Sequence, residues 1–234
     1  ARGPFEGLQG GAVAALMCAA IEADAEGFVA SVTTHFLKAA PLAPLMVAVK
    51  PLREGRRVSV IDATLSGAEG VLAVQRATLI REQDAGALPT PPKAPVSPDE
   101  FPLQSRPSPH GLPWLMDAME MRLSPSGVTW CRLKIPVVDR AGPMASVLPA
   151  ADWAHGLAPP LGAAVRPQGV AIPNPDVTVH LFRRPAGAWI GVEPASAWSH
   201  AAIGAGWGAL YDVGGLIGRV AMSIAVSAMK QPRL

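Results

Sequence analysis

Charged residues are scarce in this chain of 234 residues. Only 16% of the residues are Asp, Glu, Lys or Arg, and the formal net charge is +2. The arginines are scattered and form no basic stripe, so we expect no nucleic-acid partner. Because half of the residues are hydrophobic, the low charge indicates a folded globular chain and argues against intrinsic disorder.

Cysteine is almost as rare. Cys18 and Cys131 lie in apolar stretches without the spacing of a metal site. They indicate reduced, packed thiols in a cytoplasmic protein and argue against a disulfide framework. We expect no metal ion and no cofactor. A secretory signal is not apparent either, because no apolar run follows Arg2.

Two further patterns are missing. The sequence contains no G-x-S-x-G elbow, which argues against a serine hydrolase. Residues 203–229 form a hydrophobic tail, but this tail contains Asp212, Arg219 and several glycines. We therefore expect β-strands there and no membrane-spanning helix.

The chain does have one strongly apolar segment, residues 8–23. Residues 10–21 carry no charge and no polar face, which predicts a buried helix. Twelve helical residues span about 18 Å, too short for the ~30 Å core of a bilayer. Gly10 and Gly11 stand at the expected helix start, where a ligand can approach the unpaired first-turn amides. Tight helix packing would explain the two glycines equally well.

The rest of the chain predicts strands, a linker and a second helix. Residues 83–113 contain nine prolines and almost no periodicity, which predicts an extended linker. Residues 144–157 are expected to form a helix, although Pro149 lies within it. β-branched and aromatic runs bounded by Gly and Pro predict strands at residues 28–37, 45–52, 58–65, 71–80, 119–123 and 128–135.

The pattern of the first half returns in the second. The run from Val32 to Lys38 matches the run from Val177 to Arg183 at an offset of 145 residues. The same offset pairs Val47 with Val192, Leu65 with Leu210, Gly70 with Gly215 and Gly11 with Gly156. A constant offset over so many residues predicts a tandem duplication of a helix-plus-sheet unit.

Several motifs fit this picture in order along the chain. In the first half they are Leu8-Gln9-Gly10-Gly11, Thr34-His35-Phe36-Leu37 and the hairpin at residues 52–59. In the second half they are Asp152, the run from Asp176 to His180, Arg184-Pro185 and Gly218-Arg219-Val220-Ala221. With these motifs the chain resembles the acyl-CoA thioesterases of the thioesterase II type.

The resemblance implies an α+β double hotdog, in which two tandem antiparallel sheets of five to six strands each wrap around a long apolar helix. It places an N-terminal hotdog at residues 1–82, the proline-rich linker at 83–113 and a C-terminal hotdog at 114–234. It also implies that residues 31–37 and 177–182 pair edge to edge. We expect a homodimer of double hotdogs.

The resemblance further implies an acyl-CoA substrate and a set of site residues. Asp152 takes the position of the catalytic aspartate, and Asn174 takes that of a Thr or Ser that helps to hold the attacking water. The Gly11 amide would serve the oxyanion. The family's third polar residue, a glutamine in the last strand, falls at Ala225, which cannot replace it. Candidate substrate-binding residues are Gln9, Gly10, Arg56 and Arg57, the arginines as partners of coenzyme A phosphates.

Three functions therefore stay open. The first is hydrolysis of an acyl-CoA thioester by water with Asp152 as base. The second is a non-catalytic protein that binds acyl-CoA or another hydrophobic ligand, which Ala225 favours. The third, a hotdog hydratase, lacks its motif. His35 and His180 occupy matching strands, where contacts between the two halves explain them better than catalysis does, and His155 alone is weak evidence for a base.

Overall fold

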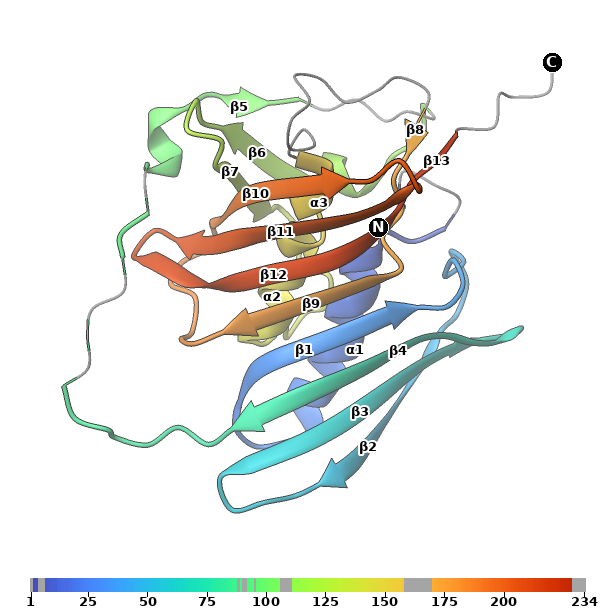
Figure 1. Cartoon of the computed structure of the whole chain (residues 1–234). Helices are drawn as coiled ribbons and strands as arrows, with labels where there is room; N and C mark the ends of the chain where they lie inside the picture. Colours follow the sequence, from blue (N-terminus) through green and yellow to red (C-terminus); the bar gives the residue numbers. More distant parts are fainter. Residues whose placement is uncertain are drawn as a thin grey trace.

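The computed structural model describes residues 2–3, 7–87, 89, 92–94, 96–105, 111–157 and 170–228. One antiparallel sheet of eleven strands dominates these residues, and helices α1 (Gly10–Asp24) and α2 (Pro143–Ala151) lie against one of its faces (Figure 1). The strand order is β2-β3-β4-β1-β9-β12-β11-β10-β7-β6-β5. This arrangement confirms the expected α+β double hotdog.

The first four strands along the chain belong to the N-terminal half and the others to the C-terminal half. They are β1 (Phe28–Phe36), β2 (Met46–Arg53), β3 (Val58–Gly67), β4 (Gly70–Ile80), β5 (Leu103–Gln104), β6 (Met119–Leu123), β7 (Thr129–Leu133), β9 (Asp176–Leu181), β10 (Ile190–Trp198), β11 (Ile203–Asp212) and β12 (Gly215–Ala225). A separate pair joins β8 (Val170–Ala171) and β13 (Ser227–Ala228). The sheet thus divides unevenly between the halves, where five to six strands each were expected.

The two halves join through β1 and β9, as predicted. The register pairs Ser31 with His180 and His35 with Asp176, so Thr33 and Thr178 face each other at the centre. Their hydroxyl oxygens lie 3.0 Å apart, and the two residues are separated by the repeat offset of 145. Each half therefore covers the edge strand of the other.

The repeat is visible in the strand bounds. β11 and β12 correspond residue for residue to β3 and β4 at the same offset, and the sheet register is interrupted after Leu65 and after Leu210 alike. The correspondence does not extend to the helices. α2 begins at Pro143, well before Gly156, so the match between Gly11 and Gly156 was wrong.

Helix α1 is buried because it has no polar face. Met17, Cys18 and Ile21 are fully buried, and α1 packs against α2 on one side and the N-terminal strands on the other. Cys18 and Cys131 are both buried, and neither forms a disulfide. No helix in the described part of the chain is long and apolar enough to cross a bilayer.

Two predictions for the connecting segments need correcting. The helix expected over residues 144–157 is broken into α2 and the short α3 (Ala154–Leu157), with Asp152 as the C-cap of α2. The proline-rich segment is not extended throughout. It contains a 3-10 turn, η1 (Pro98–Glu100), and strand β5, which pairs with β6 at the sheet edge. The domain boundaries themselves stay a prediction.

Candidate active site

The break between α2 and α3 places a carboxylate between the two halves of the protein. Asp152 is only 3% exposed, although it carries a group that is normally ionised. Its Oδ2 accepts hydrogen bonds from Gln9 Nε2 at 2.5 Å and from the Gly11 amide at 2.8 Å. Its Oδ1 accepts one from Asn174 Nδ2 at 2.8 Å. A buried carboxylate is stable only with such donors, because burial removes its hydration.

Two of these donors come from the start of α1. Gln9 is the N-cap of the helix, and its Oε1 accepts a hydrogen bond from the Ala12 amide at 2.9 Å. Gly11 lies two residues further on and leaves room for Asp152, because a Cβ there would be 2.7 Å from the Asp152 Cβ. The glycine is therefore required for the helices to approach each other, which agrees with the packing interpretation of the sequence.

The third donor comes from the segment before β9. Asn174 stands between two prolines, and its Nδ2 also donates to the Asp176 carbonyl at 3.2 Å. This second bond fixes the amide, because the carbonyl can only accept. Asn174 thus holds the carboxylate oxygen that the donors of α1 do not reach.

Burial raises the pKa of Asp152 above its ordinary value of 3.8. The positive charge of His155 and the hydrogen bonds from Asn174 and Gly11 oppose this rise only in part. A raised pKa makes the carboxylate a better proton acceptor once it is ionised.

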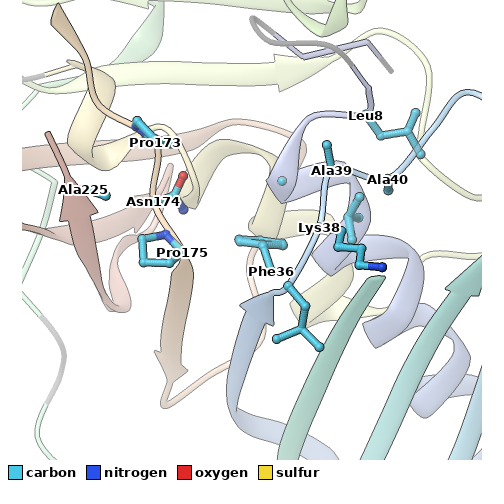
Figure 2. A pocket seen from close by; sticks show the side chains of 12 residues that line it. Leu8, Phe36, Lys38, Ala39, Ala40, Pro173, Asn174, Pro175 and Ala225 are labelled. Carbon is cyan, nitrogen blue, oxygen red and sulfur yellow. The ribbon is translucent and has the colours of Figure 1, made fainter. Parts of the chain in front are cut away.

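Two hollows lie beside the start of α1. The smaller one, about 80 Å³, is lined by Asp152, Gln9, His155 and Asn174 among others, and can hold a few water molecules. The larger one, about 360 Å³, has a mainly apolar lining that includes Phe36, Lys38 and Ala225 (Figure 2). Leu8, Gly10 and Asn174 line both hollows, so the two are neighbours.

The structure brings most of the predicted site residues together. Five of them meet in space around the first residues of α1, namely Gln9, Gly10, Gly11, Asp152 and Asn174. The role expected for Gly11 needs correcting, because its amide donates to Asp152 and is not open to an oxyanion. Gln9, expected to bind substrate, instead contacts the carboxylate.

Arg56 and Arg57 lie elsewhere. They occupy the turn before Val58, which pairs with Ile80, and Ile80 pairs with Phe28, the first residue of β1. The hollows lie at the other end of this strand, beside Phe36. The two arginines are therefore not part of the site that this chain forms.

Sequence reasoning undervalued two neighbours of the site. His155 follows Asp152 by one helical turn, and this spacing already places the two on the same side of a helix. Lys38 lines the larger hollow and lies two residues past the end of β1, so its position there was the available signal. His35 and His180 are exposed on the sheet face that is away from α1.

Fold and site together define a double-hotdog protein with a buried, amide-held aspartate beside an apolar hollow. Two family models match the chain, the acyl-CoA thioesterase N-terminal domain over residues 3–81 and the acyl-CoA thioesterase C-terminal domain over residues 82–226. The chain therefore belongs to the acyl-CoA thioesterase family.

Solved structures with the same fold have low sequence identity to this chain. A hotdog-fold protein of Alicyclobacillus acidocaldarius is 20% identical with a TM-score of 0.73, covering 96% of this chain and 89% of that one. The TesB protein of Mycobacterium avium subspecies paratuberculosis is 20% identical with a TM-score of 0.67, covering 93% and 86%. An acyl-CoA thioesterase II of Mycobacterium marinum is 17% identical with a TM-score of 0.65, covering 94% and 89%. No curated protein matches the sequence.

Proposed function

We propose that the protein hydrolyses an acyl-CoA thioester to the free acid and coenzyme A by direct attack of water. The observation that carries this proposal is the Asp152 carboxylate, which is buried, held by three donors and open to a hollow of about 80 Å³. A base in such a place can activate a water molecule without any covalent intermediate.

The reaction balances as follows. Asp152 takes one proton from the water as its oxygen forms a bond to the thioester carbonyl carbon, which leaves an oxyanion. The oxyanion then collapses, the carbon–sulfur bond breaks, and coenzyme A leaves as a thiolate that takes up the proton held by Asp152, which restores the base. Asn174 Oδ1 can accept the other hydrogen of the water, since its Nδ2 already donates to Asp152.

Gly10 is the proposed oxyanion donor in place of Gly11. The first amides of a helix have no partner within the helix, and those of Gly11, Ala12 and Val13 are accepted by Asp152 or Gln9. Gly10 lines both hollows, and no acceptor for its amide is found in the described part of the chain. The positive end of the α1 dipole adds to the stabilisation of negative charge there.

The larger hollow is the proposed place for the acyl group next to the thioester. Its lining is mainly apolar, with Phe36 and two prolines beside Asn174 (Figure 2). Lys38 at its rim is suited to a phosphate of coenzyme A, because an ammonium group can move to meet a charge on a large ligand.

A second candidate is a protein that binds acyl-CoA without turnover. Ala225 favours it, because loss of one polar donor from a hydrolytic site costs about 10² to 10³ in rate. The two functions share the fold and the hollow, so only the chemical step separates them.

Release of free thiol from a panel of acyl-CoA thioesters separates the two functions. We expect Asp152→Ala to lower kcat by at least ~10³-fold, whereas Asp62→Ala, on the exposed sheet face, keeps it. On the acid side kcat should fall as Asp152 takes up a proton, with a midpoint above 3.8 because burial raises the pKa of this carboxyl. Unchanged hydrolysis in Asp152→Ala would remove Asp152 from the mechanism, and tight binding by wild type without thiol release would support the binding protein.

A further inference from the structure

One polar group expected at the site is missing from the last long strand. Ala225, near the end of β12, stands where the family resemblance implies a glutamine, and its methyl group cannot donate a hydrogen bond. Ala225 lines the larger hollow together with Asn174. Strand β12 therefore contributes no side-chain donor to the hollow at this position.

A side-chain amide at the start of α1 does reach the Asp152 carboxylate. Gln9 is 4% exposed, and its Nε2 lies 2.5 Å from Asp152 Oδ2. The direction of this amide is fixed, because the backbone N–H of Ala12 can only donate and must face the oxygen Oε1. The NH2 group consequently faces Asp152. Both ends of the Gln9 side chain are held, one by the helix it caps and one by the carboxylate.

We infer that Gln9 is the positioning residue that replaces the missing strand glutamine, holding the Asp152 carboxylate from the N-cap of α1. The inference rests on the proposed function of Asp152 as base. Gln9 acts through this carboxylate and not on the substrate.

The pattern of donors shows what Gln9 contributes. A carboxylate oxygen has two lone-pair sites. Oδ2 of Asp152 uses both of its sites, for Gln9 and Gly11, whereas Asn174 is the one hydrogen-bond donor to Oδ1 found among the residues that the structure describes. The site left on Oδ1 is then the proton acceptor. Without Gln9, a site on Oδ2 becomes free and the carboxylate can rotate away from the orientation needed by the water.

The test must separate this role from the capping of α1. Gln9→Ser retains a good N-cap side chain but is too short to reach Asp152. We expect kcat for thiol release to fall by about 10²-fold with little change in KM, because the geometry of the base is lost and not substrate binding. The acid limb of the kcat profile should move to higher pH, because the ionised carboxylate loses a donor.

Gln75 offers a matched control. It is also a buried glutamine of the N-terminal half, with its Nε2 bonded to the Ala14 carbonyl and the Thr34 hydroxyl and not to Asp152. Gln75→Leu should change the free energy of unfolding but leave the acid limb of the kcat profile unshifted. The double variant Gln9→Ser, Ala225→Gln should recover at least part of the kcat lost in Gln9→Ser. Absence of any recovery would overturn the equivalence of the two positions.

A measurement that does not depend on turnover separates the proposed role of Gln9 from the proposed role of Asp152 as base. Carbon-13 NMR titration of the Asp152 carboxyl in wild type and Gln9→Ser should show the same shift of the midpoint to higher pH. An unchanged titration midpoint together with an unchanged kcat overturns the role of Gln9, even if Asp152→Ala is inactive. If Asp152→Ala keeps full turnover while Gln9→Ser still shifts the titration midpoint of the Asp152 carboxyl, Asp152 is rejected as the base but its contact with Gln9 is retained.

Discussion

Replacement of Gly11 by alanine tests how closely the site depends on helix packing. A Cβ at this position would lie 2.7 Å from the Asp152 Cβ, 2.7 Å from the Leu148 oxygen and 3.0 Å from the Pro149 Cα. None of these atoms can rotate away, so α2 would have to move by about 0.7 Å to restore ordinary contact. Alanine gains about 1 kcal/mol in helix propensity. Overpacking costs about 1 to 3 kcal/mol, so we expect a net loss of about 1 kcal/mol in the free energy of unfolding.

The same movement should disturb the carboxylate. The Gly11 amide to Asp152 Oδ2 distance is 2.8 Å, and an added 0.7 Å, roughly, takes it beyond hydrogen-bond range. We expect kcat to fall by about 10²-fold in Gly11→Ala, as for other small misplacements of a reacting group. Urea unfolding and thiol release measure the two effects. Ala20→Gly is the control for propensity in α1, with a loss of about 1 kcal/mol and an unchanged kcat. An alanine variant as stable and as active as wild type would refute this reasoning.

Other contacts give predictions that need only stability or kinetic measurements. Arg183→Ala should lower the free energy of unfolding by about 3 kcal/mol, because it strands the fully buried Asp212, whereas Arg184→Ala, at an exposed pair, should cost less than about 1 kcal/mol. A similar cost for both in urea unfolding would contradict this. Burial raises the pKa of Glu22 above 4.5, so the folded state binds the Glu22 proton more tightly than the unfolded state does. The contribution of Glu22 to the free energy of unfolding therefore falls as pH rises through the folded pKa. Glu22→Gln should remove this pH dependence from thermal unfolding measured against pH. Lys38→Ala should raise KM for acyl-CoA about threefold without changing kcat, and an unchanged KM would remove Lys38 from substrate binding.

Much of the sheet could be predicted because strands leave local signals. Each predicted β-branched run became a strand within a few residues, and β6 has the bounds that the sequence indicated. The pairing of β1 with β9 was predicted from the family resemblance, and the structure confirms it. The extra strand β5 was not, because two residues in a proline-rich segment carry no periodicity.

The order of helix and strands along the sequence could have shown that Arg56 and Arg57 lie away from the start of α1. Each antiparallel strand reverses the direction of the chain, so β1 ends beside the start of α1 and β2 returns toward the end of α1. The turn after β2, with Arg56 and Arg57, must then lie far from Gly10. In contrast, the Gln9 contact with Asp152 joins residues 143 positions apart through side chains alone. Neither spacing nor composition encodes such a contact, because it depends on how α1 and α2 pack.

The packing of these two helices suggests how a base can arise from a structural feature. Glu22, near the end of α1, accepts hydrogen bonds from the Met144 and Ala145 amides at the start of α2, at 2.9 and 3.2 Å. Asp152, at the end of α2, accepts one from the Gly11 amide at the start of α1. Each carboxylate satisfies unpaired first-turn amides and interacts favourably with the dipole of the neighbouring helix.

The two carboxylates differ in what else surrounds them. The hydrogen bonds recorded for Glu22 join it to backbone amides of α2, whereas Asp152 also receives the side-chain amides of Gln9 and Asn174 and borders a hollow. The additional amides at Asp152 stabilise a carboxylate that burial has desolvated, and under the proposed function they also fix its orientation as the base. Because the proposed base is also a cap, Asp152→Ala should lower stability as well as kcat. The loss of activity is therefore to be measured at a temperature where the variant is still folded.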